Sequence, residues 1–259
     1  MRSNSVAFFG VSALLFAASW VATIAWCASM STMGEMTMPG GWTMSMAWMR
    51  MGGQSWLGLA QSFLGMWIVM MMAMMLPSLI PMLWRYREAV ETDGAWLGGR
   101  TALVGVGYFF VWAVYGIAVF LLGATLTGIE MQRPALARVV PIAVGVAVVI
   151  AGAVQFTSWK KKHLSCCRNE PRRGRTLAAD AGTAWRQGLR LGLHCSCCSA
   201  GLTAILLVIG VMDLRVMAAT TAAITIERLA PAGERVAHVI GGVIVGGGLI
   251  FIARAARLG

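Results

Sequence analysis

The sequence predicts an all-α fold: a polytopic bundle of six or seven transmembrane helices, with residues 1–259 forming one integral membrane domain. Apolar residues make up 58% of the 259 positions and charged residues 12%, about half the share usual in soluble domains. A soluble domain of this length cannot bury so much apolar surface, so the composition excludes a soluble enzyme and a disordered chain. The apolar runs are long and lack the alternation of strands, which predicts helical spans and not a β-barrel.

Apolar segments follow one another along the chain, and a helical span needs about 20 such residues. The first segment is too long for the apolar part of a signal peptide and has no small-x-small cleavage motif, so we expect an uncleaved anchor. Two later segments are short, and one of them can be half-inserted instead of crossing the membrane. The number of predicted spans is therefore six or seven. The predicted spans are residues 6–27, 57–84, 101–123, 139–159, the two short segments 200–214 and 216–230, and 236–253.

The basic residues predict the orientation, because Lys and Arg prefer the cytoplasmic side of a membrane. The net charge of +11 therefore sets the topology, and we expect no nucleic-acid partner. Nine Lys and Arg residues lie between 160 and 190, in a predicted inner loop over residues 160–192, whereas the predicted outer segment 28–56 has only Arg50. Counting the spans backwards places four further arginines inside, and with them the N-terminus: Arg2, Arg85, Arg87 and Arg100.

Methionines crowd the predicted outer segment, where Gly, Ser, Thr and Pro leave little core for them to fill. Thioethers are soft, uncharged ligands that select Cu(I) over Zn²⁺ and the hard cations. The alternative is an interfacial segment in which Met and Trp side chains lie on the lipid headgroups. The candidate copper ligands are three Met-x-Met pairs: Met36 and Met38, Met44 and Met46, and Met49 and Met51.

A second methionine run lies inside the predicted span 57–84. Met70 and Met74 share one helical stripe, and Met71 and Met75 share the next one, since residues four apart lie on the same face. Such stripes are typical of packing, and they also place several thioethers in a row as candidate ligands. Pro77 frees a backbone carbonyl about one turn earlier, in the middle of this run.

Five of the six cysteines lie in or next to the predicted inner loop, together with two histidines. A reducing cytoplasm keeps such thiols free, and neighbouring Lys and Arg lower thiol pKa values, which favours metal binding or redox chemistry. Close packing, or a disulfide if the orientation is inverted, are the alternatives. The candidate ligands of this shared site are His163, Cys166, Cys167, His194, Cys195, Cys197 and Cys198.

Few other polar residues lie in the apolar segments. Glu227 is a functional candidate because acids inside a membrane are rare, and an ion pair with the adjacent Arg228 is the structural alternative. No phosphate loop, dinucleotide fingerprint, paired-histidine helix or serine elbow is present, so the sequence gives no sign of catalysis.

Three motifs resemble one known family. Pro39-Gly-Gly-Trp42, the run from Trp67 to Ser78, and Gly192-Leu-His-Cys-Ser-Cys-Cys198 are similar to motifs of the bacterial predicted metal-binding integral membrane proteins. The cysteine motif here is one residue shorter than the family's usual pattern. The resemblance implies metal binding in a bacterial inner membrane, without implying a transport direction or a reaction.

These patterns together favour a copper-handling membrane protein. Thioethers outside, a methionine-lined span and thiols inside form a path along which Cu(I) can pass to tighter ligands without ATP. We expect copper uptake, or relay to a copper-requiring enzyme or membrane complex. A non-catalytic accessory subunit of a larger membrane enzyme is the main alternative, and a membrane redox enzyme is a weaker one.

Overall fold

The computed structural model describes residues 2–31, 36–37, 43–44, 53, 55–90, 96–169, 180–211 and 213–258. These residues form eight helices and one pair of two-residue antiparallel strands, which confirms the all-α prediction. The elements are α1 (Arg2–Ser31), β1 (Met36–Thr37), β2 (Thr43–Met44), α2 (Trp56–Ala89), α3 (Trp96–Gln132), α4 (Pro134–Val154), α5 (Ser158–Asn169), α6 (Ala181–Ile209), α7 (Leu214–Leu229) and α8 (Gly233–Leu258).

Five helices are long and apolar enough to cross a membrane: α1, α2, α3, α6 and α8. A sixth span results if α4 and α5, which are bent by 62° at their junction, count as one. The described residues provide no seventh span. The predicted short helix 200–214 is the end of α6, a longer helix that begins at Ala181. These helices are compatible with a multi-pass membrane protein.

Most of the predicted inner loop 160–192 is helical, and this part of the prediction was wrong. The basic helix α5 and the first turns of α6 occupy it, because Lys and Arg are good helix formers whose charge hides the pattern from an apolar scan. Asp180 caps α6 by accepting hydrogen bonds from the Thr183 backbone amide and hydroxyl, at 2.8 and 2.6 Å. The same bonds lower the pKa of the Asp180 carboxyl below its usual range.

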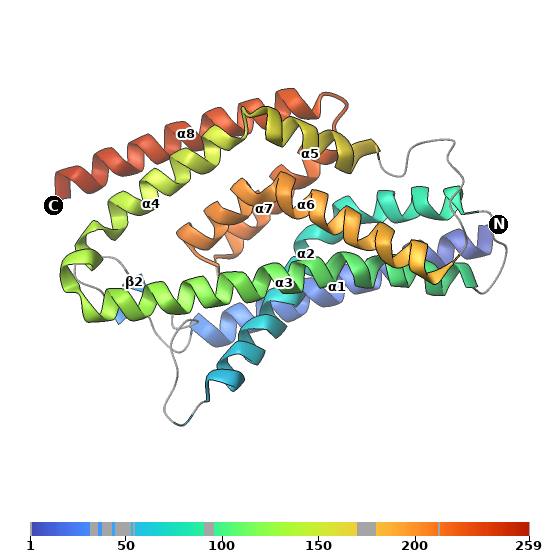
Figure 1. Ribbon diagram of the computed structural model, residues 1–259, viewed down its shortest axis with the longest axis horizontal. Coiled ribbons are helices and arrows are strands. Elements are labelled where there is room, and N and C mark those ends of the chain that lie inside the picture. Colours follow the sequence, from blue (N-terminus) through green and yellow to red (C-terminus); the bar gives the residue numbers. More distant parts are fainter. Residues whose placement is uncertain are drawn as a thin grey trace.

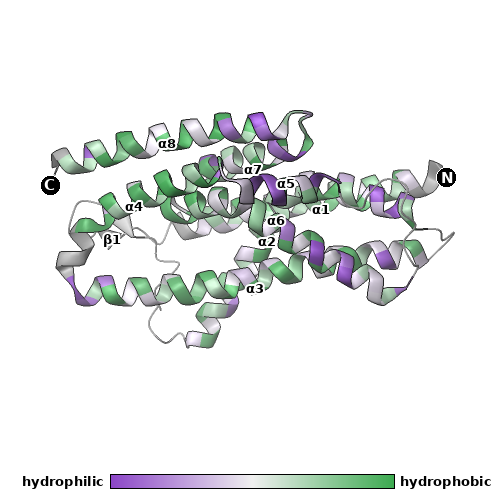
Figure 2. Ribbon diagram, turned by 45° about the horizontal axis from the view of Figure 1, so that its top comes forward, coloured by the Kyte–Doolittle hydropathy of each residue, from purple (hydrophilic) through white to green (hydrophobic). Residues whose placement is uncertain are grey.

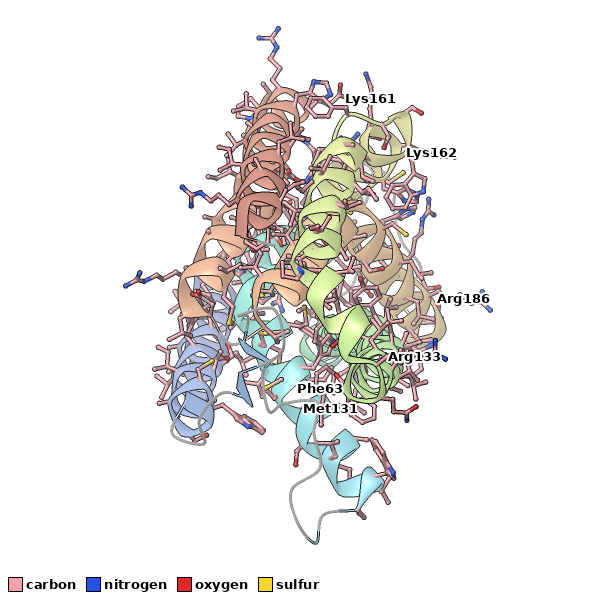
Figure 3. All side chains as sticks on the ribbon, turned by 90° about the vertical axis from the view of Figure 1, so that its left-hand side faces the viewer. Phe63, Met131, Arg133, Lys161, Lys162 and Arg186 are labelled. Carbon is pink, nitrogen blue, oxygen red and sulfur yellow. The ribbon has the colours of Figure 1, made fainter. Side chains whose placement is uncertain are left out.

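The long helices lie side by side in an elongated bundle, and the two chain termini lie at opposite ends of it (Figure 1). The helix α3 packs along α6 and α4 packs along α8, while the short α7 contacts α2, α6 and α8. Hydrophobic residues cover most of each long helix, whereas hydrophilic residues gather on α5 and on helix ends near the N-terminus (Figure 2). Lys161, Lys162 and Arg186 project outward from this bundle (Figure 3).

The helix α2 forms the centre of the core. Its Pro77 and Pro81 are accommodated within the helix, which continues to Ala89. Most of its methionines face the neighbouring helices, since Met71 and Met74 are both 0% exposed. The span that the sequence marked as rich in methionine is therefore the most enclosed one, a position that suits either packing or ligand binding.

Candidate metal centre

Four sulfur atoms from three helices meet inside the bundle. The Sγ atoms of Cys167 on α5 and Cys198 on α6 are 3.5 Å apart. One turn away on α6, Sγ of Cys195 lies 3.8 Å from Sδ of Met75 on α2. All four side chains are buried and the three cysteines carry free thiols. We call Met75, Cys167, Cys195 and Cys198 the sulfur centre.

Close packing of α3 against α6 brings a tyrosine to this centre. A Cβ atom at Gly107 would lie 3.0 Å from the carbonyl oxygen of Trp185, and one at Gly192 would lie 2.9 Å from that of Tyr108. These glycines allow the two backbones to approach one another, as small residues do between membrane helices. The Tyr108 hydroxyl consequently shares a 2.8 Å hydrogen bond with the Cys195 thiol and fixes its position.

Buried polar contacts fasten α5 to α6 and α7. The Lys160 ammonium lies 2.7 Å from the Glu227 carboxylate and also donates to the carbonyl oxygen of Cys198. From the other end of α5, Arg168 donates to the carbonyl oxygens of Glu227 and Pro231 at 3.0 and 3.1 Å. These contacts position the Cys167 thiol of α5 against α6. They also explain why Lys160, which the sequence places in an exposed loop, is buried.

Arg228 is buried beside the sulfur centre. The ion pair with Glu227 that the sequence suggested as an alternative is not among the ion pairs of the described residues. Consecutive helical residues point about 100° apart, so Glu227 faces Lys160 while Arg228 faces the cysteines. Arg228 Nη1 donates to the Ser78 hydroxyl at 2.6 Å. Its Nε and Nη2 atoms have no hydrogen-bond partner among the described residues.

The charges around the centre do not cancel in the described residues. Lys160 and Glu227 neutralise each other, which leaves the buried Arg228 guanidinium as a single positive charge. Besides its Ser78 partner, the surroundings of Arg228 include the thiols of Cys167, Cys195 and Cys198 and the Tyr108 hydroxyl. An unpaired buried charge is costly, so an anion bound beside Arg228 would stabilise this arrangement.

Two histidines form a second pair on the same helices. His163 of α5 and His194 of α6 are half-buried, and their Nδ1 atoms are 3.2 Å apart. The Trp159 ring lies against His163, with ring centroids 4.8 Å apart. Cys166 and Cys197 are also half-buried, but within the described structure neither contributes to the sulfur contacts of the centre.

The other methionine candidates have less defined positions. Met70, Met71 and Met74 are buried in the core of α2, where they continue the line of thioethers that ends at Met75. Met36 and Met44 are register partners in the β1–β2 pair. Met38, Met46, Met49 and Met51 lie outside the described residues, so their role as copper ligands stays a prediction.

The donor set of the centre is soft and has few members. No group of three His, Cys, Asp or Glu side chains in the described part of the chain is arranged to hold a metal ion. The described residues therefore form no tetrahedral set of Cys and His side chains of the kind that holds zinc. Two close thiols with a neighbouring thioether fit Cu(I), which prefers sulfur ligands.

Sequence reasoning missed the partners that organise this centre. Tyr108, Ser78 and Lys160 carry no local motif that links them to cysteines, and Tyr108 is 87 positions away from Cys195. The available sign was chemical: polar residues inside apolar spans need partners. This rule identifies which polar residues need a buried partner, but it does not identify the side chain that each of them contacts.

Comparison with known proteins identifies the metal. A family model described as copper chaperone, with the designation PpoB2, matches residues 64–251. No curated protein and no solved structure matches the chain. The matched segment covers more than half of the chain, and it supports the association of this chain with copper. The chain belongs to the copper chaperone family.

Proposed function

We propose that this protein is a membrane copper chaperone that receives Cu(I) on thioethers and holds it at the buried thiols of Cys167 and Cys198. The observation that carries the proposal is the meeting of these two thiols, 3.5 Å apart, beside the buried Arg228. Thiolates bind Cu(I) strongly, and a thioether and a third thiol lie within reach of the same pocket.

Charge balance supports two thiolate ligands and not one or three. Cu(I) with two thiolates carries one negative charge, which the Arg228 guanidinium neutralises. A single thiolate leaves the buried cation unbalanced, and three leave a net negative charge in an apolar interior. Cys195, which is hydrogen-bonded to Tyr108, then remains a neutral thiol, and Met75 supplies an uncharged sulfur.

The arrangement of sulfur atoms supports a direction from the Met-rich segment toward the thiols. The helix α2 starts directly after that segment and carries its methionines toward Met75, which touches Cys195. Beyond the thiols, the half-buried pair His163 and His194 provides an exit toward the end of the bundle rich in Lys and Arg. That basic end supports a cytoplasmic N-terminus in a bacterial inner membrane. The recipient would be a copper-requiring protein or membrane complex.

Copper content of the purified, detergent-solubilised chain tests this function. We expect near-stoichiometric Cu(I) in the wild type and almost none in the variant C167S/C198S. The matched control is C166S/C197S, which removes two thiols from the same two helices and should keep its copper. A wild type that purifies without copper, or equal copper in both double variants, would contradict the proposal. Copper uptake into cells with and without the chain then tests the direction.

A further inference from the structure

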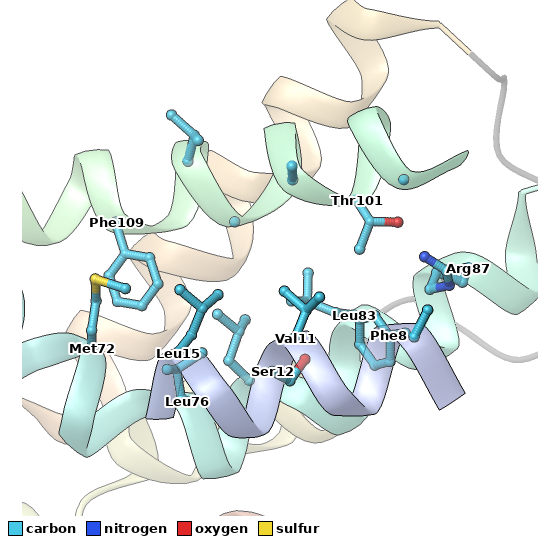
Figure 4. A pocket seen from close by; sticks show the side chains of 16 residues that line it. Phe8, Val11, Ser12, Leu15, Met72, Leu76, Leu83, Arg87, Thr101 and Phe109 are labelled. Carbon is cyan, nitrogen blue, oxygen red and sulfur yellow. The ribbon is translucent and has the colours of Figure 1, made fainter. Parts of the chain in front are cut away.

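A second cavity lies between α1, α2 and α3, away from the sulfur centre. The helix α1 packs along α2 and has few or no contacts with α3, so a cleft of about 840 Å³ separates them. Figure 4 shows Phe8, Val11 and Leu15 of α1 on one side and Thr101 and Phe109 of α3 on the other. A volume of this size is within the range of ligand sites.

The walls of this α1–α2–α3 cleft are apolar along most of its length. Leu76 and Leu83 of α2 form its floor, and Met72 lies at one end beside Phe109 (Figure 4). Among the residues that the structure describes, no cysteine or histidine lines it, so the cleft is separate from the sulfur centre. An open apolar cleft between membrane helices is filled by hydrocarbon, because water has no hydrogen-bond partners there.

The other end of the cleft is lined by a cationic side chain, that of Arg87. Arg87 lies in the last turn of α2, where the bundle becomes hydrophilic, and its guanidinium is 5.1 Å from the centre of the Phe8 ring. The ion pairs of the described residues are Lys160 with Glu227 and Lys161 with Glu234. Among these residues, no carboxylate therefore forms an ion pair with Arg87. The cleft thus combines a positive mouth with an apolar interior.

We propose that the α1–α2–α3 cleft binds one anionic phospholipid from the surrounding leaflet. The lipid phosphate lies on the Arg87 guanidinium, whose planar fork matches phosphate oxygens, and an acyl chain runs along the cleft toward Met72. The charge of the mouth selects an anionic headgroup over a zwitterionic one. This lipid seals α1 against α3, a role separate from copper binding.

The glycines of α3 provide variants that fill the cleft without disturbing the fold. Gly105 lines the cleft, and a Cβ atom added there would meet nothing within 4 Å. Leucine at this position occupies the path of the acyl chain. Gly128 lies on the same helix, has the same open surroundings and does not line the cleft. G128L is therefore a matched control for G105L.

Native mass spectrometry of the full chain, titrated in detergent with phosphatidylglycerol or phosphatidylcholine, tests the proposal. We expect one phosphatidylglycerol per wild-type chain, preferred over phosphatidylcholine by about tenfold, the value of one charge-assisted contact. R87Q should abolish that preference, and G105L should abolish retention of both lipids. G128L and R254Q, the latter at the opposite end of the chain, should behave as the wild type.

Three results would overturn the lipid site: equal retention of both lipids by the wild type, an unchanged preference in R87Q, or lipid retention in G105L. A dimer that G105L dissociates would identify a second copy of the chain as the occupant instead. Copper content measured on the same samples separates the two proposals. R87Q should keep its copper, so a failure of the lipid site leaves the sulfur centre untouched.

Discussion

Two pairs of cysteines, each with one member on α5 and one on α6, have the same thiol chemistry and different surroundings. Cys167 and Cys198 are buried at 0% and 3% exposure, and their sulfur atoms touch. Cys166 and Cys197 precede them by one residue on the same helices and are half-buried. One residue of helix turns a side chain by about 100°, which is enough to move a thiol from the shared interface to its edge.

The helix face, and not adjacency in the sequence, is thus the basis on which we propose Cys167 and Cys198 as the copper ligands. The buried pair has Arg228 and the fixed Lys160–Glu227 ion pair beside it, whereas the half-buried pair has neither advantage. Four experiments test this difference, starting with the one of largest expected effect.

Removing the buried ion pair should disturb the buried cysteines most. In E227Q, the Lys160 ammonium loses its charged partner at 2.7 Å, and we expect a loss of about 3–5 kcal/mol in the free energy of unfolding. The matched control is E234Q, which breaks the exposed pair of Lys161 and Glu234 and should cost under about 1 kcal/mol. Denaturant unfolding in detergent measures both. Equal losses would mean that the Lys160–Glu227 pair does not hold α5.

Removing the positive charge should weaken copper binding without removing a sulfur atom. In R228Q, a dithiolate complex of Cu(I) remains one charge negative in an apolar interior, and we expect its affinity to fall by about 10–100-fold, as for other groups that support metal ligands. R228K keeps the charge and should retain most of the affinity. Competition with a chromophoric Cu(I) chelator gives both constants. An unchanged affinity in R228Q would refute the charge-balance argument.

Thiol labelling compares the two pairs directly. Because accessibility limits alkylation, we expect Cys166 and Cys197 to react with a maleimide at least about ten times faster than Cys167 and Cys198 in the folded chain. Peptide mass spectrometry at several times resolves the four sites. Equal rates for all four thiols would show that the buried pair opens readily, and the distinction between faces would then be lost.

The smallest effect is expected for the thioether. Leu replaces Met with little change in volume, so M75L removes the sulfur next to Cys195 at a packing cost under about 1.5 kcal/mol. We expect the Cu(I) affinity to fall by no more than about tenfold, since the two thiolates remain. M82L, further along α2 and outside the candidate ligands, is the control and should bind copper as the wild type. An equal loss in both variants would assign the effect to packing.

The fold class and the long spans followed from composition, because a bilayer imposes long apolar runs that a sequence displays openly. The helix α5 did not, since it is basic, and polar contacts of Lys160 and Arg168 hold it against α6 and α7. Its burial depends on a carboxylate 67 positions away, and no local pattern encodes that contact.

The sulfur centre was predictable by residue type and not by arrangement. Soft ligands in the chain indicated copper, and the family match agrees with that. The contact between Met75 and Cys195 joins two motifs that lie 120 positions apart in the sequence and that the sequence predicts at different depths of the membrane. The outer methionine pairs remain a sequence prediction.

The bend of 62° between α4 and α5 has a mechanical consequence for the two thiols that we propose as copper ligands. Cys198 belongs to α6, whose glycines allow close packing against α3. Cys167 belongs to the short helix α5, which follows α4 after a break at residues 155–157 and which side chains such as Arg168 hold against α7 among the described residues. Under the proposed function, we expect any widening of the gap between the two sulfur atoms to take place at this break. The twelve residues of α5 would then move as one unit during loading and unloading of Cu(I).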